Sequence, residues 1–174
     1  MTDARPDLTG VVPIPTFRGS PSTVASDLVG VDPWDRRSTI VVIGVRHWTL
    51  LLFLSAHCDG CMDIWGALSG PPDDWPAVEG VRPVVVARDL GAGTQEDLRR
   101  LSTPGVPLLI SDSAFGDYRV HGAPFFALVD GPGGRVATEG VAWGAQSVAE
   151  SVARARAGKG GPDVPRLVPR EREG

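Results

Sequence analysis

The sequence predicts a single α/β domain whose central sheet has helices on both faces. The first observation behind this prediction is the order of the segments, in which strand-like and helix-like runs alternate along most of the chain. The second is the run 49–56, which is almost continuously apolar, as expected of a strand buried on both faces. The third is the size, because 174 residues of which 42% are apolar suit one domain with a sizeable core.

The first 38 residues predict little regular structure. They contain one short apolar patch, residues 11–14, and several prolines, which interrupt strands: Pro6, Pro13, Pro15, Pro21 and Pro33. We therefore expect residues 1–38 to form an irregular arm with at most a short edge strand. Two strands should follow, a β-branched one over 39–45 and the apolar one over 49–56, joined by a turn at 46–48.

The middle of the chain predicts a helix, a strand and a second helix. The first helix should cover residues 58–68 and end at the breakers Gly70-Pro71-Pro72. Residues 81–87 have the composition of a strand. The sequence Thr94-Gln95-Glu96-Asp97 resembles a capping box that opens a short helix to about Leu101.

The last part of the domain predicts a strand, a short helical segment, a hairpin and a final helix. These elements are expected over residues 106–110, 111–120, 125–129 with 135–141, and 145–157. A glycine-rich loop, residues 130–134, joins the hairpin strands. Residues 158–174 have no periodicity and are expected to be disordered, so that the folded domain would span residues 39–157.

Cys58 and Cys61 are the two cysteines of the chain, and they lie where the apolar strand passes into the first helix. Residues three apart share one face of a helix, so the two sulfurs can come within bridging distance. A thiolate at a helix N-terminus is stabilised by free N–H groups and by the positive end of the dipole. In a βαβ setting this CxxC pair is typical of a thioredoxin-like redox motif, and it predicts thiol–disulfide oxidoreductase activity.

Composition excludes other classes of protein. The formal net charge of −4 argues against nucleic acid as the main partner. No apolar run reaches the roughly 18 residues that a membrane-spanning helix needs. Residues 1–6 show no charged region followed by an apolar one, so the sequence predicts a cytoplasmic protein. There a surviving disulfide is usually catalytic or sensing.

Several separated segments resemble the thioredoxin fold, in particular its TlpA-like and MauD-like (redoxin) branch. The matching segments are Phe53-Leu54-Ser55-Ala56-His57-Cys58-Asp59-Gly60-Cys61, Val84-Val85-Val86, Tyr118-Arg119-Val120-His121-Gly122-Ala123-Pro124, and the hairpin around residues 128–136. The resemblance covers roughly residues 38–157. It implies a three-layer α/β/α domain with a central mixed sheet.

The same resemblance implies roles for individual residues. Cys58 would attack a substrate disulfide and Cys61 would resolve the mixed disulfide. Pro124 would follow a cis peptide bond and lie beside the cysteines, and the backbone of Ala123 would pair with an extended substrate segment. The implied partners are a protein disulfide or dithiol and an electron donor or acceptor. No cofactor and no metal are expected.

The chain departs from the family at three positions. Asp59 places an anion beside Cys58, which should make that thiol less acidic, whereas a cationic His57 would favour the thiolate. Leu52 occupies the strand position where thioredoxins have a buried carboxylate, and Ala123 replaces the threonine or isoleucine often found before the proline. His57 and Asp59 are therefore candidate modulators of the pair.

Two other functions stay open at the level of sequence. The cysteines could form a switch or staple in a non-catalytic adaptor of the same fold. They could also belong to a metallochaperone, but a metal site needs three or four ligands, and His47, His57 and His121 are the histidines that could supplement the pair. A peroxidatic site is disfavoured, because Leu51 and Ser55 stand where its proline and threonine would be.

Overall fold

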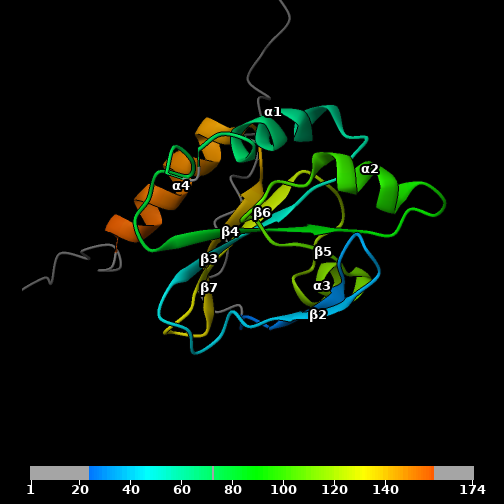
Figure 1. The fold of residues 1–174 in the computed structure, drawn as a ribbon. Coiled ribbons are helices and arrows are strands. Elements are labelled where there is room, and N and C mark those ends of the chain that lie inside the picture. The colour runs from blue at the N-terminus through cyan, green and yellow to red at the C-terminus, as the bar shows by residue number, and fades with distance from the viewer. Residues whose placement is uncertain (1–23, 72, 159–174) are drawn as a thin grey trace, which may run out of the picture.

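The computed structural model describes residues 24–71 and 73–158, which form one mixed sheet of seven strands with four helices packed on it (Figure 1). The strands lie in the order β2-β1-β5-β4-β3-β6-β7. In chain order the elements are β1 (Leu28–Val31), β2 (Arg37–Ile40), β3 (Trp48–Phe53), α1 (Asp59–Leu68), β4 (Val81–Ala87), α2 (Thr94–Leu101), β5 (Leu108–Ile110), α3 (Asp112–Asp117), β6 (Phe125–Asp130), β7 (Arg135–Val141) and α4 (Ala145–Ala157).

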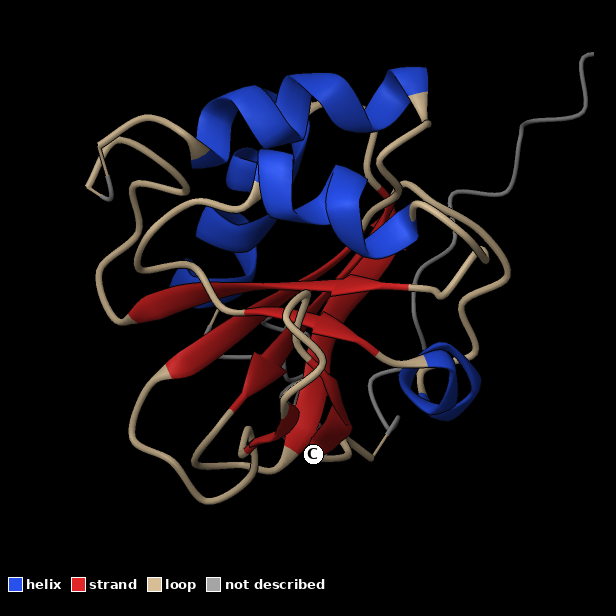
Figure 2. Ribbon diagram, turned by 45° about the vertical axis from the view of Figure 1, so that its right-hand side comes forward, coloured by secondary structure: helices blue, strands red, loops and turns tan. Residues whose placement is uncertain are grey.

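Helices cover both faces of the sheet, as the sequence predicts. Helices α1, α2 and α4 contribute to the hydrophobic core on one face, and α3 contributes to the core on the other face (Figure 2). Strand β3 separates the two cores. Leu50 and Leu52 belong to the first core and Leu51 to the second, because successive side chains of a strand point to opposite faces. The predicted strand that is buried on both faces is confirmed.

Strand β3 lies inside the sheet, parallel to β4 and antiparallel to β6. All six of its residues are buried. Such a strand is held by hydrogen bonds on both sides and by apolar contacts on both faces, so its end is a fixed point in the molecule. The chain leaves this point at Leu54 and reaches the first cysteine four residues later.

The predicted arm is wrong for its described part, residues 24–38. These residues form β1 and lead into β2, and the two strands make an antiparallel hairpin that pairs with β5. β1 is an interior strand with only four residues, too short for its pattern to stand out in the sequence. Gly30 makes the pairing possible, because a Cβ there would collide with the carbonyl oxygen of Ile110. Residues 1–23 lie outside the described part of the chain.

The predicted strand over 39–45 is also wrong beyond Ile40. Asp27 Oδ1 accepts hydrogen bonds from the backbone N–H groups of Val42 (2.8 Å) and Ile43 (3.1 Å), so a side chain replaces a neighbouring strand. Gly44 then turns the chain with a positive φ of 74°. A β-branched composition predicted a strand, but the distant aspartate that satisfies this backbone could not be identified from the local pattern.

The remaining elements agree closely with expectation, with one local exception. Strand β4 and helix α4 have the predicted bounds. The capping box at the start of α2 is wrong, because Gly93 is the N-cap with a φ of 90°. The Thr94 hydroxyl instead accepts a hydrogen bond from the Leu90 N–H at 3.1 Å, which closes the preceding loop. Of the predicted disordered tail, residues 159–174 lie outside the described part.

No helix in the described ranges has the length and apolar character needed to cross a membrane.

Candidate functional site

The candidate site begins where β3 ends and α1 starts. Cys58 is the N-cap of α1, with extended backbone angles (φ −102°, ψ 116°) and no side-chain cap. The first backbone N–H groups of a helix have no partner within the helix. These N–H groups form the positive end of the α1 dipole, so that end lies at Cys58, which is the arrangement expected from the sequence.

Cys58 and Cys61 form a disulfide, with their Cα atoms 5.1 Å apart. The two cysteines differ in accessibility. Cys61 is completely buried in the core beneath α1, whereas Cys58 is partly exposed. A molecule that approaches from solvent can therefore contact Cys58 but not Cys61.

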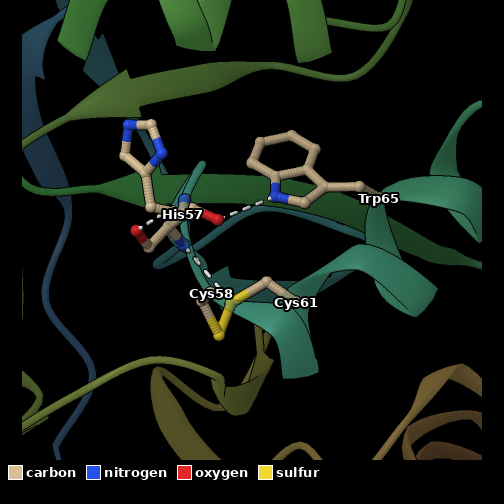
Figure 3. The surroundings of a disulfide bond; sticks show 5 residues. His57, Cys58, Cys61 and Trp65 are labelled. Atoms are coloured by element: carbon tan, nitrogen blue, oxygen red, sulfur yellow. Dashed lines mark hydrogen bonds between the residues drawn. A yellow bond between two sulfur atoms is a disulfide. The ribbon is translucent and has the colours of Figure 1, made fainter.

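Ser55, which follows β3, is hydrogen-bonded to two residues of α1 (Figure 3). Its backbone N–H donates to Cys61 Sγ at 3.4 Å, and its carbonyl oxygen accepts a hydrogen bond from Trp65 Nε1 at 3.1 Å. Trp65 is 5% exposed, so this indole anchors α1 against the end of the strand. The sequence gave no reason to assign Ser55 to the site, because Ser55 acts through its backbone.

The His57 side chain pairs with a residue of α2. Its ring points away from the sulfur atoms (Figure 3), and Nε2 lies 2.9 Å from Asp97 Oδ2 of α2. The His57 side chain is 68% exposed. The pair therefore links the loop before Cys58 to α2. Asp59 is exposed in the first turn of α1, next to Cys58, where the sequence placed it.

Pro124 lies beside the cysteine pair despite its distance along the chain. The Ala123–Pro124 peptide bond is cis. A Cβ added to Gly60 would lie 3.3 Å from Pro124 Cγ and 3.9 Å from Cys58 Sγ, so the proline ring and the exposed sulfur border the same small space. Gly60 leaves that space open. The hydrogen-bond pattern of the loop is also informative. Pro124 O accepts from the Ala142 N–H at 3.1 Å, whereas no backbone hydrogen bond between described residues involves Ala123.

A cavity of about 180 Å³ adjoins the strand end. Its wall includes residues that follow β3 and β4, residues of α2 and α3, and residues of the loop before Pro124, among them Ser55, His57, Arg88, Thr94, Phe115 and Ala123. Arg88 is the charged residue that the sequence interpretation missed. It follows β4 directly, and the carboxyl ends of parallel strands are where α/β folds bind ligands. Its guanidinium lies over the Phe115 ring, 4.4 Å from the centroid.

The described residues contain no group of three or more histidine, cysteine, aspartate or glutamate side chains placed to hold a metal ion. His47 and His121, which the sequence offered as supplementary ligands, do not join the cysteine pair in such a group. Burial, and to a lesser extent the positive charge of Arg82, lowers the pKa of His47. Leu52, at the position of the carboxylate of thioredoxins, is fully buried among apolar side chains.

Solved structures resemble this arrangement across most of the chain. One is the thioredoxin domain of a thiol-disulfide oxidoreductase from Bacteroides vulgatus, with a TM-score of 0.58 at 19% identity, covering 78% of this chain and 96% of that one. Another is a thiol:disulfide interchange protein of the thioredoxin family from Chlorobium tepidum, with a TM-score of 0.59 at 13% identity and coverages of 78% and 97%. The fold is thioredoxin-like.

The same fold likeness extends to yeast Sco1 with copper bound, at a TM-score of 0.59 and 15% identity, covering 83% of this chain and 99% of that one. At these identities the likeness establishes the fold and leaves the chemistry to the residues themselves. No family model and no curated protein sequence matches the chain. The thioredoxin-like, redoxin-type resemblance inferred from the sequence agrees with these neighbours.

Proposed function

We propose that this protein is a thiol–disulfide oxidoreductase that exchanges its Cys58–Cys61 pair with a protein partner. The observation that supports this most directly is the difference between the two cysteines. Cys58 is partly exposed at a helix N-terminus, and Cys61 is buried behind it. A structural staple has no need of such a difference, whereas exchange requires an attacking thiol that meets the substrate and a resolving thiol that does not.

In the reducing direction the proposed reaction has two steps. The Cys58 thiolate attacks one sulfur of a substrate disulfide, a bond forms between them, and the other substrate sulfur leaves as a thiolate. The Cys61 thiolate then attacks Cys58 Sγ and forms the disulfide seen in the structure, and the second substrate sulfur leaves. Two electrons pass from the cysteine pair to the substrate. The reverse sequence oxidises a substrate dithiol.

The surroundings suggest how the substrate and the sulfurs are held. The backbone of Ala123 makes no hydrogen bond to another described residue, and it would pair with an extended segment that passes over Pro124, close to Cys58. The Ser55 N–H that contacts Cys61 Sγ would stabilise a thiolate on Cys61 when the pair is reduced. Asp59 would oppose the thiolate form of Cys58, because a like charge nearby raises the pKa of an acid.

Replacement of one cysteine at a time tests the proposal. In Cys61→Ser the first step remains possible but the second does not, so covalent mixed disulfides with partner proteins should accumulate. Both variants are expressed in the native host, recovered under non-reducing conditions and compared by electrophoresis before and after reduction. Cys58→Ser is the matched control, because it removes the accessible sulfur and should yield few adducts or none.

The adaptor hypothesis predicts a different outcome. If both variants are free of adducts and the wild-type protein binds a partner without a covalent bond, the cysteine pair is a switch or staple and the proposed function fails. A third hypothesis, the metallochaperone, predicts stoichiometric metal in the reduced wild-type protein, measured by elemental analysis.

A further inference from the structure

A second cavity, of about 620 Å³, adjoins Pro124. It lies between the loop that follows α3 and the end of strand β7, and its walls are mainly apolar. The residues that matter here are Tyr118, Arg119, Pro124, Phe125, Glu139 and Val141. Because Pro124 borders both this cavity and the space next to Cys58 Sγ, a polypeptide held at the disulfide has direct access to the cavity.

Glu139 is the unusual residue of this cavity. Among the described residues its Oε2 atom is buried and has no hydrogen-bond partner, a state it shares with Thr49 Oγ1 on strand β3, and Glu139 is the one of the two that can carry a charge. Burial raises the pKa of this carboxyl, and the positive charge of Arg119 partly opposes that effect. A buried carboxylate oxygen without a partner is costly, and a cation or a donor brought in by a ligand would remove that cost.

We propose that this cavity binds a lysine or arginine side chain of the protein substrate, close to the substrate's reactive cysteine, with the cationic group at Glu139. The inference rests on the proposed function, because it specifies the substrate class of the same site. The methylene stem of such a side chain would lie on Phe125 and the half-exposed Val141, while its charged end meets the carboxylate.

The other charged groups of the cavity are compatible with this occupant. Arg119 and His121 also line it, but both are exposed to solvent. Among the described residues no ion pair involves Glu139, so Arg119 does not occupy the carboxylate. An acidic substrate side chain would instead meet Glu139 in apolar surroundings, where repulsion is strong.

Peptides with one variable residue test the inference. Each peptide has a single cysteine linked by a disulfide to a chromogenic aryl thiol, and lysine, norleucine or glutamate is placed at each of two positions on either side. Attack by Cys58 on the peptide sulfur releases the coloured thiolate, so the second-order rate constant is read directly. At one of these positions we expect the lysine peptide to react about tenfold faster than the norleucine peptide, a difference that one charge-assisted hydrogen bond can provide. The glutamate peptide should react most slowly at that position.

Glu139→Gln should abolish the lysine advantage and leave the norleucine peptide unchanged. Glu79→Gln removes an equal charge from an exposed position at the opposite end of the sheet, and it should keep the preference. Turnover of a small, uncharged disulfide checks that both variants retain their chemistry. Equal rates for lysine and norleucine in the wild-type protein would overturn the inference while leaving the proposed function intact.

A binding measurement separates the two proposals from each other. The oxidised protein is titrated with fluorescent peptides in which serine replaces the cysteine, and anisotropy gives the Kd. Tighter binding of the lysine peptide that is lost in Glu139→Gln supports the cavity as a cation site even if no disulfide exchange is seen. Equal Kd values for the lysine and glutamate peptides would count against the cavity whatever the exchange assay shows.

Discussion

At the residue scale, burial distinguishes two chemically identical side chains. Cys58 and Cys61 are three positions apart on one short helix, yet α1 covers one sulfur completely and leaves the other accessible. The sequence predicts this difference, because Ile64 and Leu68 identify the face of the helix that packs on the sheet. The partners of the buried sulfur could not be predicted, since Ser55 contacts it through a backbone N–H that every residue type would offer.

Alkylation of the reduced protein measures the difference. With limiting iodoacetamide Cys58 should be modified first and Cys61 only after local opening of α1, because alkylation requires direct approach to the sulfur. Peptide mapping by mass spectrometry after short exposures gives the order. Denaturant should equalise the two rates, which provides the control. Faster modification of Cys61 in the folded protein would contradict the assigned roles.

At the element scale, the strand–helix junction is held by one tryptophan. The Nε1–H of Trp65 donates to the carbonyl oxygen of Ser55, and the N–H of Ser55 contacts Cys61 Sγ, so the helix, the strand end and the buried sulfur form one hydrogen-bonded unit. Trp75 makes a comparable bond to the Ala145 carbonyl at 2.9 Å, at the start of α4, and does not contact Ser55.

Trp65→Phe should therefore change both stability and redox behaviour. The loss of a hydrogen bond to this half-buried carbonyl should lower the free energy of unfolding by about 1 kcal/mol, measured by urea titration of the oxidised protein. A less firmly held Ser55 should stabilise the Cys61 thiolate less, so the equilibrium with glutathione should shift toward the disulfide. Trp75→Phe is the matched control. It should lose similar stability with an unchanged redox equilibrium, and an identical shift in both variants would contradict the role of Ser55.

The success of sequence prediction also varies by element. The sequence pattern predicts β3, β4 and α4 well. A continuous apolar run is stable only as a strand buried inside the sheet, and an apolar stripe at helical spacing is stable only as a helix packed on its face. The hairpin of β1 and β2 could not be predicted, since its strands have four residues each and depend on distant partners such as Ser111, whose hydroxyl donates to Val29 O at 2.6 Å. The cavity beyond Pro124 could not be predicted either, because it forms between β7 and the loop after α3, and no local sequence pattern indicates that these two segments lie together.

At the scale of the whole molecule, Glu139 makes stability depend on pH. Its pKa is raised from the ordinary value of 4.5 mainly by burial, so the folded state binds the proton more tightly than the unfolded state does. The stabilising contribution of the protonated form is fully present below pH 4.5 and is lost as pH rises through the higher pKa of the folded state.

We expect the melting temperature of the wild-type protein to fall relative to that of Glu139→Gln as pH increases from about 4 to about 7, a range that spans ordinary and raised carboxyl values. Differential scanning calorimetry of both proteins in matched buffers measures this difference. Glu79→Gln, which removes an exposed carboxyl, should show no such trend relative to the wild type. A constant difference between the wild type and Glu139→Gln across the range would show that the carboxyl titrates alike in both states.

The order of the strands determines where another polypeptide can extend the sheet. One border is β2, a strand of four residues whose side chains alternate between exposed and half-buried. The other border is β7, and its beginning is occupied by a bridge from Val24 to Arg135. Beyond that bridge, the described residues leave the later part of β7, up to Val141, without a neighbouring strand on its outer side. A strand of another protein can add to a sheet border that has unpaired backbone groups. The hydrogen bonds then form between main-chain atoms and do not depend on the side chains. The later part of β7 ends beside Pro124, whose carbonyl oxygen accepts a hydrogen bond from the Ala142 N–H, so a foreign strand that adds to this border would compete with a substrate that approaches the disulfide.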